Sequence, residues 1–259
     1  NGSMSGTFAD LAAQFPPLEA ARADGLLCAG GDLQPARLLA AYSLGIFPWY
    51  EEGLPILWWS PDPRCVLPLE DFCLPSRSAR ALRRRPFELT LDAAFGEVIR
   101  ACAGLRANGH GTWLTPEMIA AYERLHALGY AHSVEAWREG ALVGVALGRA
   151  FFGESMFHRE SEASRAALAG LVALLRLRGA VVLDCQQETP HIMRMGGVML
   201  PRAAFRERLA RALAAEGWRE EREAREPDAL RREIRAVPWA PWKTGYSYSA
   251  INGSWIARS

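Results

Sequence analysis

Residues 150–186 carry a helical pattern between two strand-like patterns, and this order constrains the fold more than any other feature of the chain. The runs "AFFGESMF" (150–157) and "AVVLDC" (180–185) are short and apolar, as buried strands are. Between them, "SRAALAGLVALLRLRG" (164–179) has the length and periodicity of a helix, which Ser164 would cap and Gly179 would end. The sequence therefore predicts a strand–helix–strand unit.

The segment before this unit predicts antiparallel strands. "AHSVEAWREGALVGVALGRAFFGESMF" (131–157) reads as successive strands, the first pair joined at "REGA". Antiparallel strands followed by a strand–helix–strand unit are typical of an α+β domain with a mixed sheet. Further helices are expected after Thr115 and Pro116, which form a good N-cap and N1 pair, and at 201–215.

Composition divides the chain into three parts. Residues 8–64 are rich in Gly, Pro and aromatic residues and predict a small N-terminal domain, with one helix at 33–44. The proline-rich "SPDPR" (60–64) marks a boundary. Residues 65–215 form the α+β domain, and residues 216–259 are a charged and aromatic extension to which the sequence assigns no role.

Charge and cysteine usage exclude several classes of protein. The net charge is only +1, so a polyanion must be held by a local basic patch. The five cysteines are scattered and never spaced as C-x-x-C, which predicts neither a disulfide framework nor a metal site. The longest apolar stretch is too short to span a bilayer, and "NGSMSG" at the start does not resemble a signal peptide. We therefore expect a cytoplasmic protein without membrane contact and, since no heptads are found, a monomer.

Asp184 and Gln186 come after the apolar run "VVL" (181–183) and are the first candidate functional residues. Residues just past the carboxyl end of a strand face a crevice where ligands bind. Two residues apart in extended geometry, their side chains would point to the same side and could hold and aim an amine. The alternative is that Asp184 caps or pairs locally and Gln186 is merely exposed.

Glu154 is the second candidate, because it interrupts an otherwise apolar strand. A buried carboxylate must find a partner or water. Glu154 either pairs with an arginine or faces the same crevice as Asp184 and receives a cation. The apolar side chains expected to line a slot beside it, or to be plain core, are Phe151, Met156, Leu168 and Leu171.

Basic and aromatic residues suggest a nucleic-acid partner. Arg77, Arg80 and Arg84 share one helical face, with Arg83 and Arg85 alongside, and arginine forks match phosphate oxygens. Several of the nine tryptophans stand beside Pro or Gly, which is typical of stacking platforms and equally of loops packed on a core. Cys185 is a weak candidate nucleophile, since a cysteine at a strand end is usually structural.

Six stretches, spread over about residues 15 to 210, form one recognisable series. They are "GLLCAGGDLQPARLLAAYSLGIFPWY", "ILWWSPDPR", "GTWLTPEMIAAYERLHALGYAHSVEAW", "FFGESMFHR", "LDCQ" and "HIMRMGGVMLPR". Together, and in the same order, they resemble the leucyl/phenylalanyl-tRNA–protein transferase family, bacterial enzymes that move an aminoacyl group from tRNA to a protein N-terminus.

The resemblance implies a small N-terminal domain and a catalytic domain of the acetyltransferase-like (GNAT) fold. It implies transfer of Leu or Phe, and less well Met, from aminoacyl-tRNA to an N-terminal Arg or Lys, which marks the protein for degradation by the N-end rule. It implies no cofactor and no metal.

The resemblance also assigns site residues. Trp49 and Trp113 would stack on the 3′-terminal adenosine. Asp184 and Gln186 match the proposed catalytic pair and Glu154 the acidic active-site residue, with Asp184 either taking the amine proton or only positioning substrate. Phe151, Met156, Leu168 and Leu183 would form the aminoacyl side-chain pocket, and Arg77, Arg80, Arg83 and Arg84 would meet the phosphates of the tRNA acceptor stem.

Two other functions are alternatives to this one. The stretch "LVGVALGRAFFGES" is about four residues shorter than the family pattern, which would suit a protein that binds tRNA without transferring its aminoacyl group. An acetyl-CoA-dependent N-acetyltransferase on the same fold is the other alternative. It would need a glycine-containing pyrophosphate loop, and "MFHRESEASRAAL" has no glycine.

Overall fold

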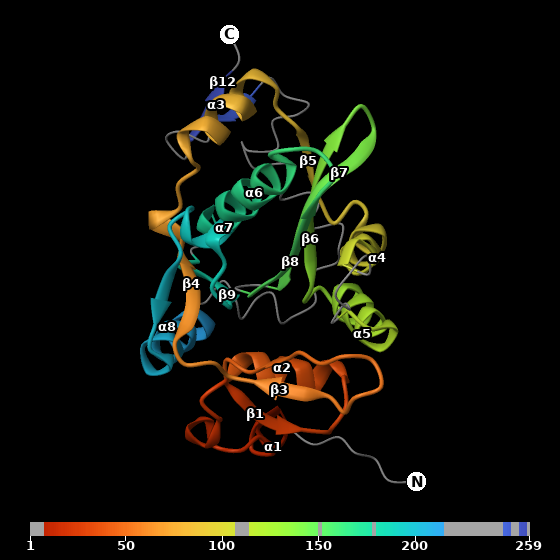
Figure 1. Ribbon diagram of the computed structural model, residues 1–259, viewed down its shortest axis with the longest axis vertical. Helices are drawn as coiled ribbons and strands as arrows, with labels where there is room; N and C mark the ends of the chain where they lie inside the picture. The colour runs from red at the N-terminus through yellow and green to blue at the C-terminus, as the bar shows by residue number, and fades with distance from the viewer. Residues whose placement is uncertain are drawn as a thin grey trace.

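The computed structural model has a small N-terminal part at one end and a larger part built on a long, twisted sheet (Figure 1). It describes residues 8–106, 114–149, 152–177, 180–214, 246–249 and 254–257. No helix in these ranges is both long and apolar enough to cross a membrane.

The N-terminal part is a three-stranded antiparallel sheet with helices beside it. The strand order is β1-β3-β2. The Asp32 carboxylate accepts a hydrogen bond from the Gln34 N–H (2.9 Å) just before α2, and Gly45, at φ +78°, follows the end of that helix. The elements are α1 (Phe8–Ala12), η1 (Leu18–Ala20), β1 (Leu26–Ala29), α2 (Pro35–Ser43), β2 (Phe47–Pro48) and β3 (Leu57–Trp59).

The larger sheet has seven strands in the order β10-β4-β9-β8-β7-β6-β5. Only β8 and β9 run parallel, and they meet at one pair, Phe152 with Asp184, whereas the other neighbours are antiparallel. The predicted α+β class with a mixed sheet is therefore confirmed. The strands are β4 (Arg64–Pro68), β5 (Glu88–Leu91), β6 (His132–Arg138), β7 (Ala141–Arg149), β8 (Phe152–His158), β9 (Val182–Gln186) and β10 (Val198–Leu200).

Helices α4 and α6 cover opposite faces of this sheet, on either side of β6 (Figure 1). Successive strand residues point to opposite faces. Accordingly, Val134 lies against Gly170 of α6, while the next residue, Glu135, accepts hydrogen bonds from backbone amides at the start of α4. The helices of this part are η2 (Leu69–Asp71), α3 (Ser76–Arg84), α4 (Phe95–Arg106), α5 (Pro116–Ala127), α6 (Ala163–Leu177), α7 (Pro190–Met193) and α8 (Arg202–Ala214).

Local sequence signals predict most element ends, with one correction. The Thr115 hydroxyl accepts the Met118 N–H (3.2 Å), as an N-cap should, and the "REGA" turn joins β6 to β7 through Glu139 and Gly140, both at positive φ. The predicted cap at Ser164 is wrong. Helix α6 begins at Ala163, after Glu162 at φ +71°, so Ser164 lies within its first turn.

In the described part of the chain's last segment, two strands form a hairpin. β11 (Tyr246–Ser249) pairs antiparallel with β12 (Ser254–Ala257). The mixed charges of "WREEREAREPDALRREIR" predict a solvated helix, but this stretch lies outside the described residues.

One hydrophobic core runs through both parts. Tyr42 of α2 packs edge-on against Phe152 of β8, with ring centroids 4.8 Å apart. Gly45 approaches α8 so closely that a Cβ would lie 2.8 Å from a ring carbon of Phe205. The start of β8, where Phe152 pairs with Asp184 of β9, is thus packed directly against the N-terminal part.

Glu135 of β6 is a fully buried carboxylate. It accepts hydrogen bonds from the hydroxyls of Thr90 and Ser133, each at 2.5 Å. Burial raises its pKa to about 7, although these two hydrogen bonds lower it.

This raised pKa predicts a pH-dependent stability. Between about pH 5 and pH 7 the unfolded Glu135 has lost its proton and the folded one still holds it, so the free energy of unfolding should fall by about 1–3 kcal/mol as pH rises. Urea unfolding across this range measures the slope. The isosteric Glu135→Gln does not titrate and should lack this part of the decline. Equal slopes in the two proteins would contradict the assignment.

Candidate functional site

A cavity of about 480 Å³ opens between the N-terminal part and the strands β8 and β9. Phe47 and Trp49 contribute to its wall from the N-terminal part, and Glu154 and Gln186 contribute from β8 and β9. The cavity therefore combines aromatic, apolar and charged walls in the place where the sequence predicts ligand binding.

Asp184 lies behind this wall, in a buried ion pair with Arg64. The Arg64 guanidinium donates from Nε to Oδ1 (2.9 Å) and from Nη2 to Oδ2 (2.7 Å), and each side chain is 1% exposed. The same guanidinium lies over the rings of Phe47 and Phe205, 4.6 and 4.9 Å from their centroids. Arg64 thus joins the N-terminal part, β9 and α8 at one point.

Gln186 links this ion pair to Glu154. Its backbone N–H donates to Asp184 Oδ1 (2.9 Å), and its side-chain Nε2 donates to Glu154 Oε2 (3.2 Å). The φ angle of Gln186 is +63°, a left-handed conformation that a non-glycine residue seldom adopts. The expectation that Asp184 and Gln186 share one extended geometry fails for this reason. Asp184 is turned to Arg64, and Gln186 lines the cavity.

The inner wall of the cavity is apolar. Met156 comes from β8, Leu168 and Leu171 from α6, Leu183 from β9 and Ile192 from α7. Phe151, also expected here, lies outside the described residues. The segment that is about four residues shorter than the family pattern still forms the β7–β8 hairpin, whose pairs run from Gly144 with His158 to Arg149 with Phe152.

Trp49 stands at the cavity and is held by a second tryptophan. It is 39% exposed, its ring centroid lies 5.7 Å from that of Trp59, and Trp59 Nε1–H donates to its carbonyl oxygen (2.6 Å). The neighbouring Tyr50 hydroxyl donates to Glu117 (3.3 Å) at the start of α5. Trp113 lies outside the described residues.

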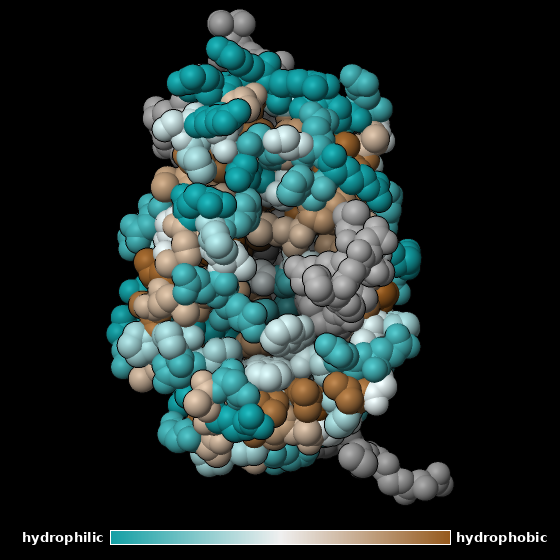
Figure 2. Space-filling model, viewed as in Figure 1, coloured by the Kyte–Doolittle hydropathy of each residue, from teal (hydrophilic) through white to brown (hydrophobic). Residues whose placement is uncertain are grey.

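The α3 arginines do not line the cavity. Arg77, Arg80, Arg83 and Arg84 are exposed and form no ion pair with the residues that the structure describes. Figure 2 shows hydrophilic side chains gathered at the end of the molecule where Figure 1 places α3. The structure thus provides a basic surface at that end, separate from the cavity.

Cys185 lines the cavity without the character of a nucleophile. Burial, followed by the nearby Cys65 and Asp184, raises the pKa of its thiol well above the ordinary value, so the reactive thiolate is disfavoured. Among the described residues, no group of three or more His, Cys, Asp or Glu side chains could hold a metal ion.

Sequence reasoning missed three residues of the site. Arg64 belongs to "SPDPR", which marks a boundary in the sequence and gives no sign of a partner 120 positions away. His158 and His191 line the cavity from β8 and α7. His158 carries a usable signal, because it continues the alternation of Glu154 and Met156 along β8.

Comparison with known proteins connects this geometry to one family. A family model described as leucyl/phenylalanyl-tRNA protein transferase matches residues 66–210, and the model of that family's N-terminal domain matches residues 31–62. The chain is similar to proteins named leucyl/phenylalanyl-tRNA–protein transferase. That of Syntrophotalea carbinolica is 57% identical over 76% of this chain and 88% of the relative. Those of Desulfatibacillum aliphaticivorans and Stutzerimonas stutzeri are 53% and 50% identical over 77% and 79% of this chain and 88% and 95% of the relatives.

Proposed function

The chain belongs to the leucyl/phenylalanyl-tRNA–protein transferase family, a family of enzymes, and we propose that it transfers Leu or Phe, and less well Met, from aminoacyl-tRNA to the N-terminal Arg or Lys of acceptor proteins. The product would be an N-end rule degradation signal, formed in the cytoplasm by a monomeric enzyme. The observation that carries the proposal is the cavity, whose apolar inner wall lies beside the Glu154–Gln186 hydrogen bond and the exposed Trp49.

The donor would occupy the cavity through its aminoacyl group and terminal base. Met156, Leu168 and Leu183 supply an apolar surface suited to an unbranched or γ-branched side chain. Trp49 would stack on the adenine, with Trp113 as its counterpart. One base–aromatic stack contributes on the order of 1–3 kcal/mol. Trp59 holds the Trp49 backbone and ring, so the stacking surface is preorganised.

The acceptor would enter at Glu154, whose carboxylate attracts a cationic N-terminal residue. Because Gln186 Nε2 donates to Glu154, the amide oxygen of Gln186 is the atom left to accept a hydrogen bond from the incoming amine. The amine attacks the ester carbonyl carbon, the peptide bond forms, and the ester bond to the ribose oxygen breaks. A free α-amino group has a pKa of about 8, so little help is needed to remove its proton.

Asp184 would serve to position Gln186. Both of its oxygens already accept hydrogen bonds from Arg64, and Oδ1 also accepts the Gln186 N–H. This arrangement favours the alternative in which Asp184 orients the site and the terminal ribose oxygens carry the amine proton. Asp184 as the general base would require an oxygen turned to the cavity.

Residues 65–215 would form a catalytic domain of GNAT type, residues 8–64 a small N-terminal domain and residues 216–259 an extension. The α3 arginines would contact the acceptor-stem phosphates, since exposed guanidinium groups that have no acidic partner among the described residues are suited to bind them.

A transfer assay tests the proposal. Radiolabelled leucine should pass from Leu-tRNA to a protein with N-terminal Arg and not to the same protein with N-terminal Ala. Phe-tRNA should serve as well, and Ile-tRNA, whose side chain is β-branched, should not. Binding of tRNA without any transfer would support a binding-only protein, and a thermal shift caused by acetyl-CoA would support an acetyltransferase.

A further inference from the structure

Two imidazoles line a part of the cavity wall that the transfer step does not use. His158 ends β8, where its Nδ1 lies 3.4 Å from the Ser164 hydroxyl of α6, and His191 lies in α7. Burial lowers the pKa of His191, followed by the charges of Arg165, Arg194 and His158. Arg165, Arg194 and His158 are therefore close enough to act on His191. Glu154 contributes a carboxylate to another part of the cavity wall.

Arg194 is the group among these whose charge is available to a ligand. It follows α7, is exposed, and forms no ion pair within the described part of the chain, whereas Arg165 pairs with Glu162 (2.7 Å). Ile192 and Met195, on either side of it, are buried and anchor this segment. The backbone that carries Arg194 is thus fixed while its side chain reaches the solvent.

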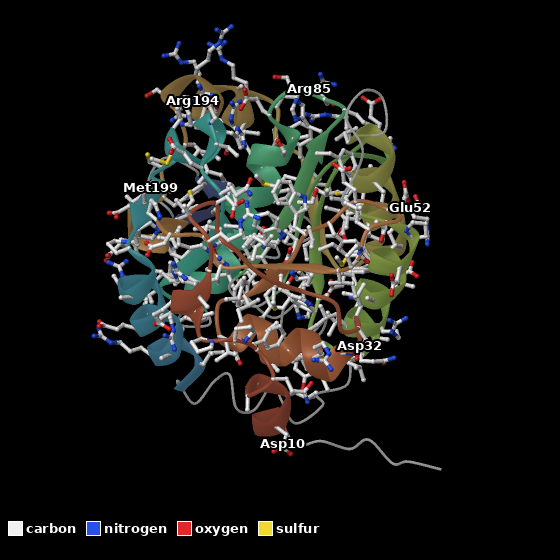
Figure 3. The ribbon with its side chains drawn as sticks, turned by 60° about the horizontal axis from the view of Figure 1, so that its bottom comes forward. Asp10, Asp32, Glu52, Arg85, Arg194 and Met199 are labelled. Atoms are coloured by element: carbon white, nitrogen blue, oxygen red, sulfur yellow. The ribbon has the colours of Figure 1, made fainter. Side chains whose placement is uncertain are left out.

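The same segment contacts the chain that leads into α3. The Cys73 N–H donates to the Met195 carbonyl (3.1 Å), and Gly196 packs so tightly on the Asp71 carbonyl that a Cβ would lie 2.4 Å from it. Figure 3 places Arg194 at the same end of the molecule as Arg85, the residue after α3, with Asp10 and Asp32 at the opposite end. The segment that carries His191 and Arg194 therefore runs from the cavity wall, which His191 lines, to the chain that leads into α3.

We propose that Arg194 and His191 bind the phosphodiester on the 5′ side of the donor's terminal adenosine. The proposal rests on the proposed function, because a tRNA whose acceptor stem lies on α3 and whose adenine stacks on Trp49 must run its single-stranded backbone between the two. A guanidinium fork and an imidazole N–H are both suited to bind phosphate oxygens. The basic wall would also turn a cationic acceptor away from the donor's path and toward Glu154.

Two small donors that differ only in this phosphate test the proposal. We would compare 3′-O-leucyl-adenosine with its 5′-monophosphate, using a protein with N-terminal Arg as acceptor. The wild type should use the phosphorylated donor about tenfold better in kcat/KM, and Arg194→Ala and His191→Leu should bring this ratio close to one. Arg211→Ala is the matched control, since Arg211 is exposed on α8 and does not line the cavity, and it should keep the wild-type ratio.

Binding of uncharged tRNA provides a readout that does not depend on transfer. The slope of log K against log salt concentration should be smaller by about 0.7 in Arg194→Ala, as expected when one contact to a single-stranded phosphate is lost. If Arg194→Ala shows the predicted smaller slope but the wild type transfers no leucine, the proposed function fails and the phosphate site stands. A wild-type donor ratio near one, or an Arg194→Ala variant with the wild-type ratio and slope, would overturn the phosphate site.

Discussion

Replacing Arg64 by methionine should lower the free energy of unfolding by about 3–5 kcal/mol. The Arg64 and Asp184 side chains are each 1% exposed, and the guanidinium supplies a hydrogen bond to each carboxylate oxygen. Methionine fills similar space but leaves the Asp184 carboxylate buried and without its cation. The loss arises from this stranded charge more than from the removal of the ion pair itself.

Urea unfolding of three proteins separates these two contributions. The double variant Arg64→Met/Asp184→Leu removes both charges, so it should recover about 2 kcal/mol or more relative to Arg64→Met alone. A double variant as unstable as the single one would mean that packing of Arg64 between Phe47 and Phe205 dominates instead.

The same ion pair decides between the two roles open to Asp184. If Asp184 only positions Gln186, then Asp184→Asn and Arg64→Lys should reduce transfer to similar extents, because each loosens the same anchor. The pH profile of the remaining transfer should keep its wild-type shape in both. A loss of kcat confined to Asp184→Asn, with an altered pH profile, would identify Asp184 as the base.

The sequence predicts the sheet class because each element carries its own periodic signal. The apolar runs at 150–157 and 180–185 become β8 and β9, and the helical pattern between them becomes α6. Thr115 and Gly140 mark their turns through local hydrogen bonding and positive φ, which depend on few neighbours. Such signals are readable without knowledge of the rest of the fold.

The site itself depends on contacts that no local pattern contains. Arg64 meets Asp184 because β4 pairs with β9, a register set by the whole sheet. Alternation predicts that Asp184 and Gln186 point to one side, but a register shift between Cys65 and Val66 and the left-handed Gln186 break it. The sequence singles out Glu154 because it is an acid in an apolar strand. It gives no sign that the side-chain amide of Gln186 donates a hydrogen bond to Glu154.

Replacing Gln186 by glycine should reduce transfer by about 10²–10³-fold while leaving the protein about as stable as the wild type. The side chain carries both the hydrogen bond to Glu154 and the amide oxygen that would meet the amine, so its removal leaves the acceptor without a fixed partner. At φ +63°, however, a side chain strains the backbone by about 1–2 kcal/mol, and glycine relieves this strain. The relief offsets the lost hydrogen bond and the greater freedom of glycine in the unfolded chain.

Gln186→Ala is the matched control, because it lacks the same side-chain amide but keeps a Cβ. It should lose transfer to the same extent as Gln186→Gly and be less stable by about 1 kcal/mol, measured by urea unfolding. Equal stability of the two variants would show that the left-handed backbone carries no strain. Transfer that survives in both would remove Gln186 from the reaction. The expected combination, an inactive protein that is no less stable, is the behaviour of a residue whose strained conformation serves function rather than folding.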